Sequence, residues 1–153
     1  ANFTSSFNEE AVKLKLYPTG EYSQQHWNFP YEWETVWNSV IKNKDFWIDL
    51  KPLCEHQFGF EPVAYVTSRS IDDNWTKSFL SKNNFPPSPV YKTDGKSKVQ
   101  ILKDLKIDIF VDDSYDNFEA LNKAGICTYL MDRPHNHRYD VGHKRIKSLK
   151  ELV

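Results

Sequence analysis

Short apolar runs alternate with helix-like segments in the second half of the chain. Clusters of β-branched and aromatic residues predict strands, and apolar residues at helical spacing predict helices between them. The predicted strands are 62–67, 90–92, 107–111 and 126–131, and the predicted helices run from Asp72 or Asp73 towards Asn84, over about 97–105 and over about 114–123. This alternation with short connections predicts an α/β fold, a parallel sheet covered by helices on both faces.

The first half has a different pattern. A helix is predicted from Thr4 or Ser5, ending before Pro18. Residues 17–52 are dense in aromatic side chains, and Trp33, Val36, Trp37, Val40 and Ile41 recur at helical spacing, which predicts two or three small helices. We expect 1–153 to form a single domain, in which 17–52 is a helical, aromatic cap inserted against a core formed by 60–153.

Composition and charge narrow the function classes. The 153 residues carry a net charge of −1, so no global field draws the chain to nucleic acid or to an anionic membrane. The apolar run 107–111 is far shorter than the roughly 20 residues that span a bilayer, and the sequence does not open on a signal segment. Cys54 and Cys127 form no Cys-x-x-Cys pair, which favours reduced thiols and a cytoplasmic protein.

Polar residues follow several of the predicted strands, at the edge of the sheet where ligands of open α/β folds bind. Carboxylates suit a hard cation such as Mg²⁺, whereas a hydroxyl and an ammonium group suit phosphate oxygens. The residues are Thr67, Ser68 and Arg69 after one strand, Asp112 and Asp113 after another, and Lys98 at the start of the intervening helix. Taken singly, each also fits a helix cap, a solvated acid pair or a surface lysine; together they indicate a site for a phosphate ester.

The same residues carry a resemblance to a known family. Residues 64–69 (AYVTSR) resemble the second motif of the haloacid dehalogenase (HAD) superfamily, Lys98 its third and residues 109–117 (IFVDDSYDN) its fourth. Residues 46–53, 125–126 and 131–136 are similar to the branch that contains 5'(3')-deoxyribonucleotidases. The resemblance covers nearly the whole chain and implies a HAD-like, Rossmann-like sheet with a small cap.

The resemblance also implies roles for these residues. Members of this superfamily are Mg²⁺-dependent phosphohydrolases in which an Asp attacks phosphorus and a second Asp is the general acid and base. By resemblance, Thr67 holds a phosphate oxygen and Lys98 stabilises the nucleophile and the developing charge. Asp113 is the principal metal ligand and Asp112 assists it, with Asn117 where many relatives have another acid. Ser68 and Arg69 contact phosphate or substrate, and the expected substrate is a nucleoside or deoxynucleoside monophosphate.

One motif of the superfamily is missing. The first motif, Asp-x-Asp, carries the nucleophile, and no Asp-x-Asp occurs in these 153 residues. Either the sequence is a fragment, which we favour, or it belongs to a relative that has discarded catalysis. This polypeptide is therefore expected to be inactive. The resemblance places the missing strand between those ending at Thr67 and Val111, so we expect these two to pair directly or a second copy to fill the gap as a homodimer.

Other functions remain open. His135, His137, His143 and Asp140 lie close in sequence, but their spacing matches no familiar zinc site, and we interpret them as surface or loop residues. A basic tail (Arg138, His143, Lys144, Arg145, Lys147 and Lys150) could bind nucleic acid, but is explained more simply by a solvated helix with Ile146, Leu149 and Leu152 turned inward. A non-catalytic protein that binds phosphate or a nucleotide is a further alternative.

Overall fold

The computed structural model describes residues 3–16 and 31–153, which form six α-helices and five strands. The helices are α1 (Phe3–Lys13), α2 (Trp33–Val40), α3 (Lys44–Ile48), α4 (Asp73–Lys82), α5 (Val99–Asp104) and α6 (Tyr115–Lys123). The strands are β1 (Tyr65–Thr67), β2 (Val90–Lys92), β3 (Ile109–Asp112), β4 (Cys127–Met131) and β5 (Arg145–Ile146). The α/β class predicted from the sequence is confirmed.

The strands form two small parallel sheets, whereas the sequence predicted one. β1 pairs with β2, and β3, β4 and β5 pair in that order. The expectation that β1 and β3 pair directly is wrong within the described residues, because β1 pairs only with β2 and β3 only with β4. β1 and β3 therefore each keep an open edge. The alternative expectation, a segment from a second copy, stays a prediction.

Two of the helices that follow strands begin at side chains that cap them, and the sequence predicted one of these caps, Asp72. Asp72 accepts a hydrogen bond from the backbone N–H of Asn74 at 2.7 Å, and Ser114 accepts one from Asn117 at 3.4 Å. At the start of α5 the N-cap residue is Lys98, which makes no side-chain cap bond. Its amine instead donates to Asp112 at the end of β3. The residue at this helix start therefore contributes a charged group to the interior.

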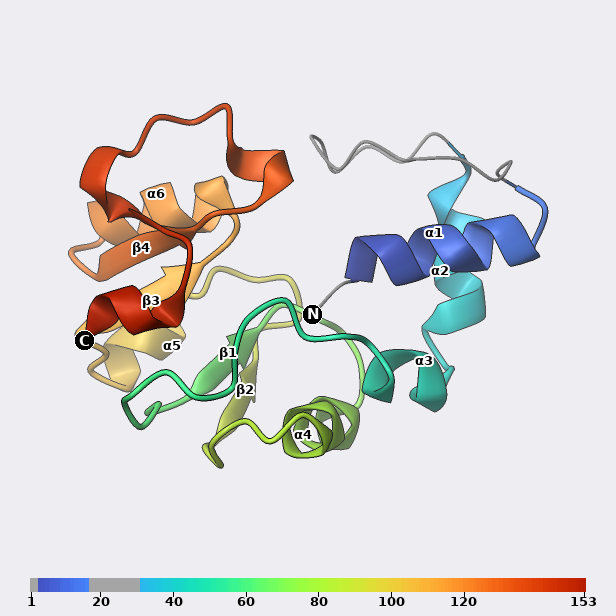
Figure 1. Cartoon of the computed structure of the whole chain (residues 1–153), viewed down its shortest axis with the longest axis horizontal. Coiled ribbons are helices and arrows are strands. Elements are labelled where there is room, and N and C mark those ends of the chain that lie inside the picture. Colours follow the sequence, from blue (N-terminus) through green and yellow to red (C-terminus); the bar gives the residue numbers. More distant parts are fainter. Residues whose placement is uncertain (1–2, 17–30) are drawn as a thin grey trace.

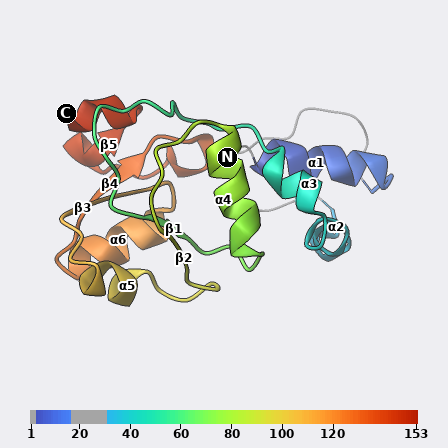
Figure 2. The same cartoon turned by 90° about the horizontal axis from the view of Figure 1, so that it is seen from below.

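The described residues contain two clusters of buried apolar side chains. One joins α1, α2 and α3 to α4, and the other lies beneath β3 and β4, where α5 and α6 pack. Figure 1 and Figure 2 show the same division: α1–α3 lie on one side, the sheet of β3–β5 on the other, and β1, β2 and α4 between them. Val66 of β1 packs against the second cluster, so the two sheets share apolar contacts.

The prediction of a helix in the basic tail is wrong. Its residues form short 3₁₀ turns on either side of β5, and Met131 of β4 is the register partner of Ile146. The backbone N–H of Asp132 donates to the carbonyl of Ile146 at 2.7 Å. Pairing with β4 buries Ile146 and satisfies its backbone, which local helix propensity cannot outweigh.

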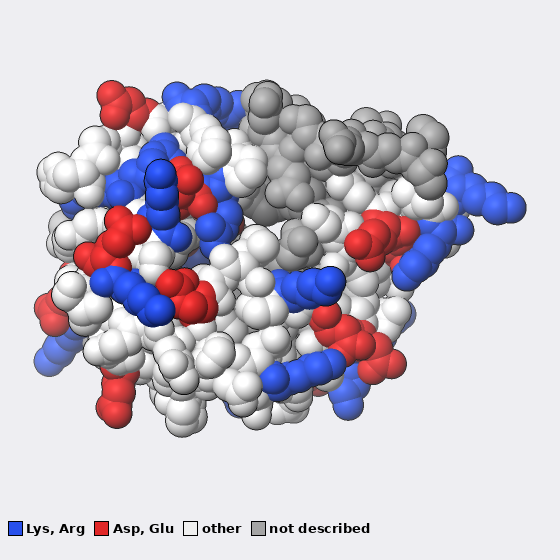
Figure 3. All heavy atoms as spheres, in the orientation of Figure 1, with Lys and Arg blue, Asp and Glu red and all other residues white. Residues whose placement is uncertain are grey.

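The described surface mixes both signs of charge. Figure 3 shows lysine and arginine side chains interspersed with aspartate and glutamate on the face in view. Cys54 and Cys127 are free thiols. In the described part of the chain, every helix is too short or too polar to cross a bilayer.

Candidate functional site

The residues singled out in the sequence line one cavity of about 1000 Å³ between the two sheets. It opens at the carboxyl ends of β1 and β3. The lining includes Thr67, Ser68, Arg69, Lys98, Asp112, Asp113 and Asn117. These side chains come from three separated parts of the sequence, and they meet because β1 and β3 both end at this cavity.

Asp112, the last residue of β3, is the centre of a buried polar cluster. Lys98 Nζ donates to its Oδ2 at 2.7 Å, and Asn117 Nδ2 donates to the same oxygen at 3.1 Å. The backbone N–H of Ser114 donates to Oδ1 at 2.9 Å. Three donors therefore hold the Asp112 carboxylate and fix its position.

Asp113 differs from its neighbour, although the two are adjacent in sequence. Its side chain is 48% exposed, and its Oδ2 lies 3.5 Å from Nε2 of His135. The backbone carbonyl of Asp113, in contrast, is held by Asn136 Nδ2 at 2.9 Å and by His135 Nε2 at 3.0 Å. The carboxylate of Asp113 is thus available at the cavity while its backbone is anchored.

The loop after β1 presents a hydroxyl and a guanidinium. Thr67 Oγ1 accepts a hydrogen bond from the backbone N–H of Arg69 at 3.2 Å, and Ser68 Oγ lies 3.4 Å from Thr93 Oγ1. The guanidinium of Arg69 lies 5.5 Å from the ring centroid of Trp47, a cation–π contact. Burial lowers the pKa of Arg69 below its ordinary value, and the negative charge of Asp113 opposes this shift.

Aromatic side chains from the helical segment line the same cavity. Phe3, Trp33, Trp37 and Trp47 face it, and Trp33 is 49% exposed. Trp47 is buried, stacks on Phe3 and donates from its indole N–H to the carbonyl of Val40 at 2.8 Å. Trp27 and Phe29, two further aromatic residues of the predicted cap, lie outside the described residues.

The chemistry of the side chains fits a hard divalent cation at Asp113. Its carboxylate oxygens are typical Mg²⁺ ligands, and Asp112 lies next to it. Within residues 3–16 and 31–153, His, Cys, Asp and Glu side chains nowhere form a group of three or more able to hold a metal. The histidines of the 131–143 region contact different acids, since His135 faces Asp113 and His137 faces Asp132.

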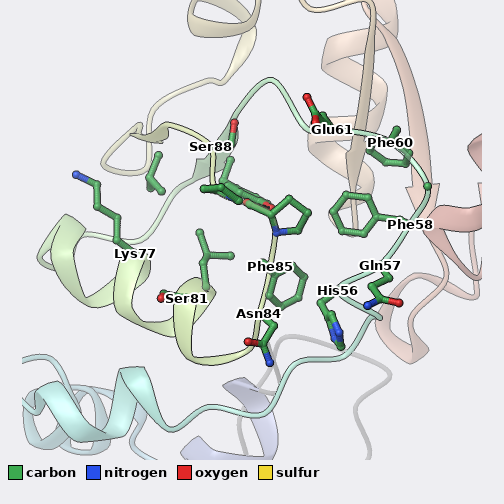
Figure 4. Close-up of a pocket in the computed structure, with 16 residues that line it drawn as sticks. His56, Gln57, Phe58, Phe60, Glu61, Lys77, Ser81, Asn84, Phe85 and Ser88 are labelled. Atoms are coloured by element: carbon green, nitrogen blue, oxygen red, sulfur yellow. Dashed lines mark hydrogen bonds between the residues drawn. The ribbon is translucent and has the colours of Figure 1, made fainter.

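A second, larger cavity of about 1310 Å³ lies next to the first, and Phe58, Tyr65, Leu80 and Phe85 line both. Figure 4 shows its rim, where Lys77, Ser81 and Asn84 come from α4 and the residues after it, and His56, Gln57 and Phe58 from the chain before β1. Its size exceeds that of the first cavity, but its lining has no pair of carboxylates and lacks Thr67, Lys98 and Asp113. Chemistry and not volume therefore identifies the cavity at Asp113 as the candidate site.

Comparison with known proteins finds two relatives with nucleotidase names. A nucleotidase of Clostridium acetobutylicum is 32% identical over 77 residues, which are 50% of this chain and 40% of that protein. A provisionally named nucleotidase of Halalkalibacterium halodurans is 29% identical over 76 residues, 48% of this chain and 39% of that protein. Each alignment spans about two fifths of the relative. No family model matches the chain, and no solved structure matches it significantly.

Sequence reasoning missed several contributors to the site. Cys54 and Leu149 line the cavity but carry no motif, and only the folded chain brings them there. Asn136 stood in a run that had been noted, yet its contact with Asp113 spans 23 positions in the sequence and could not be inferred locally.

Proposed function

We propose that this chain supplies the substrate and metal site of a Mg²⁺-dependent phosphomonoester hydrolase of the HAD type, acting on nucleoside or deoxynucleoside monophosphates. One observation carries the proposal: Thr67, Lys98 and Asp113, remote in sequence, line one cavity at the carboxyl ends of two parallel strands. The nucleotidase names of the two relatives support the substrate class.

The charges of the cavity favour a dianionic ligand in the presence of a divalent cation. Lys98 and Asp112 form a buried pair and neutralise each other. Arg69 and Asp113 contribute one further charge of each sign, and Arg133 adds one positive charge, so the five groups sum to +1. A bound Mg²⁺ would raise this sum to +3, which favours the doubly charged phosphoryl group of a monoester at neutral pH.

In this proposal each residue has its own role in binding. Asp113 holds the Mg²⁺ ion, which supplies Lewis-acid polarisation of the phosphoryl group when bound. Thr67 donates its hydroxyl to one phosphate oxygen, and Arg69 donates its guanidinium to another. Lys98 holds Asp112 in place and so orders the loop that begins at Asp113. The aromatic rings of Trp33 and Trp37 offer a face to the base.

None of the carboxylates in this cavity fits the role of nucleophile. Asp112 is held by three donors, and Asp113 is assigned to the metal. A nucleophile carried on a further strand would have its place between the open edges of β1 and β3. The cavity there measures about 1000 Å³. A five-residue strand needs roughly 800 Å³, from a rise of ~3.3 Å per residue, a strand spacing of ~4.8 Å and a sheet spacing of ~10 Å. A second copy of the chain could fill this gap as a homodimer, but it also carries no Asp-x-Asp and would not supply the nucleophile.

Non-catalytic binding of a nucleotide is the second candidate function. The absence of Asp-x-Asp from these 153 residues favours it, because the phosphate-binding and metal-binding groups remain while the nucleophile is missing. Both candidates predict Mg²⁺-dependent binding of a nucleoside monophosphate. They differ once a nucleophile-bearing strand is supplied, because only the hydrolase would then hydrolyse the monophosphate.

Titration calorimetry with dAMP, with and without Mg²⁺, tests the proposed site. We expect Mg²⁺ to strengthen binding, and Asp113→Asn and Thr67→Val each to weaken it by about tenfold, since a hydrogen bond to a charged group contributes about 1.5–3 kcal/mol. Asp108→Asn, an exposed acid before β3, is the matched control and should bind as the unchanged protein does. Equal affinity for Asp113→Asn and Asp108→Asn would contradict the proposal.

Hydrolysis of p-nitrophenyl phosphate tests the role of the nucleophile. The 153-residue chain with Mg²⁺ should be no faster than buffer. Turnover that Asp113→Asn abolishes would show that the chain has a nucleophile of its own and would overturn the expected inactivity.

A further inference from the structure

Asn136 makes a complete set of hydrogen bonds in the interior of the protein. Its side chain is fully buried, and its Nδ2 donates to the carbonyls of Asp113 at 2.9 Å and Met131 at 2.8 Å. Its Oδ1 accepts from Arg145 Nη1 at 2.6 Å and from the backbone N–H of Arg133 at 3.2 Å. Both donors and both acceptor positions of the amide are therefore used.

These bonds join three neighbouring strands at one end of the sheet. Asp113 follows β3, Met131 ends β4 and Arg145 begins β5. A buried amide that serves three strands at once rigidifies them, because breaking any one bond leaves a polar group without water. The strand ends that face the candidate site are those of β3 and β4, because Asp112 and Met131 both line the cavity.

The bond to Asp113 acts on its backbone and not on its carboxylate. The Asp113 side chain is half exposed, and its Oδ2 lies 3.5 Å from Nε2 of His135, a contact that does not fix its direction. The two donors on the Asp113 carbonyl restrict rotation of the peptide unit, which determines where the Cα–Cβ bond points. The direction of the carboxylate is thus set largely through the main chain.

Arg145 determines which way the Asn136 amide faces. Its guanidinium contacts Asn136 Oδ1, Asp132 Oδ1 at 2.9 Å and the carbonyl of Asn136 at 3.1 Å. A flipped amide would turn its NH₂ group towards this guanidinium, placing donor against donor. Arg145 therefore keeps Nδ2 directed at Asp113.

We infer that Asn136, oriented by Arg145, is a positioning residue for the Asp113 carboxylate and thereby sets the affinity of the site for a divalent cation. The inference rests on the proposed function, because it takes Asp113 as the metal ligand. It assigns a role in metal binding to Asn136 in the segment that follows β4, although Asn136 does not contact the metal itself. Residues that orient metal ligands in this way typically change metal affinity by about 10–100-fold when altered.

Asn136→Asp is the informative variant, because it keeps the shape of the side chain but replaces the Nδ2 donor by an oxygen. The carbonyls of Asp113 and Met131 then lose a donor. Asn122→Asp is a closely matched control. Asn122 also bonds a β4 carbonyl, donating to Thr128 at 3.1 Å and to Phe118 at 2.9 Å, and its Oδ1 accepts from Lys144 at 2.6 Å, but it does not line the cavity.

Two measurements on the full chain separate positioning from a general loss of stability. In amide hydrogen exchange, Asn136→Asp should accelerate exchange at 112–114 whereas Asn122→Asp should not. In Mn²⁺ titration followed by electron paramagnetic resonance, Asn136→Asp should weaken binding by about tenfold or more and Asn122→Asp by much less. If Asn136→Asp fails to fold, Arg145→Lys is measured in its place. It should also accelerate exchange at 112–114 and weaken Mn²⁺ binding, each by a smaller amount.

The outcomes distinguish this inference from the proposed function. Unchanged exchange at 112–114 in Asn136→Asp, or equal loss of Mn²⁺ affinity in both asparagine variants, would overturn the positioning role. Absence of Mn²⁺ binding by the unchanged protein would overturn the metal site of the proposed function and the metal-affinity role with it. Local acceleration of exchange would then show only that Asn136 anchors the backbone at Asp113.

Discussion

The amine of Lys98 lies 2.7 Å from Oδ2 of Asp112, and both side chains are buried, with exposed fractions of 10% and 4%. Removing one member leaves the other charge without a partner in the interior, which costs about 3–5 kcal/mol. We expect Lys98→Met to lower the free energy of unfolding by that amount, and the double variant Lys98→Met/Asp112→Leu to cost less than the sum of its single changes. Urea unfolding measures both.

The pair of Lys82 and Asp49 is the control for this prediction. Their charged atoms lie 2.5 Å apart, but the side chains are 56% and 62% exposed. Water screens such a pair, so Lys82→Met should change the free energy of unfolding by about 0–1 kcal/mol. Similar losses for Lys98→Met and Lys82→Met would show that burial does not distinguish the two pairs.

Arg69 should dominate recognition of the charged part of the ligand. Its guanidinium faces the cavity, and the contact with Trp47 positions it there. Arg69→Gln removes a cation and should weaken binding of dAMP in Mg²⁺ by about 10–150-fold, the equivalent of about 1.5–3 kcal/mol for a hydrogen bond to a charged group. Calorimetry provides the measurement. Arg138→Gln alters an exposed arginine outside the cavity and should leave the affinity unchanged.

Trp47 should contribute more to stability than its exposed neighbour Trp33. Trp47 is 1% exposed, and its indole donates to the carbonyl of Val40. Trp47→Ala would open a cavity and leave that carbonyl unsatisfied, at a cost of about 3–5 kcal/mol. Trp33 is 49% exposed, so Trp33→Ala should cost under about 1 kcal/mol in the same urea titration. A larger loss of unfolding free energy in Trp33→Ala than in Trp47→Ala would contradict the packing around Trp47.

Cys54 should react slowly with alkylating reagents at neutral pH. Burial raises the pKa of its thiol above the ordinary value of 9.0, and the charge of Arg133 opposes this shift. In a Cys127→Ser background, the rate of iodoacetamide alkylation should therefore rise with pH to a midpoint above 9. A midpoint at or below 9.0 would contradict this prediction.

The same shift links Cys54 to stability at alkaline pH. Above about pH 9 the unfolded chain loses the thiol proton while the folded chain keeps it, so the free energy of unfolding should fall as pH rises through that range. Cys54→Ser should remove this part of the decline. An unchanged alkaline decline in Cys54→Ser would show that another group is responsible.

Several elements were predictable because their determinants are local. Asp72 and Ser114 mark helix starts through bonds that span two or three residues. The strand 90–92 was recognised from its β-branched and aromatic residues, and the structure has β2 at the same residues. The tail at Ile146 was predicted wrongly, because its apolar spacing also fits a helix and only the nearby edge of β4 selects a strand.

By itself, the sequence determined which chemical groups follow the strands and in what order they occur along the chain. Thr67, Lys98, Asp112 and Asp113 were identifiable because each follows a strand or opens a helix. Tertiary structure alone decided that Lys98 pairs with Asp112 and leaves Asp113 exposed, that the strands divide into two sheets, and that Asn136 anchors Asp113. Hydrogen bonding and burial between distant segments depend on three-dimensional distance, which the spacing of residues along a chain does not specify.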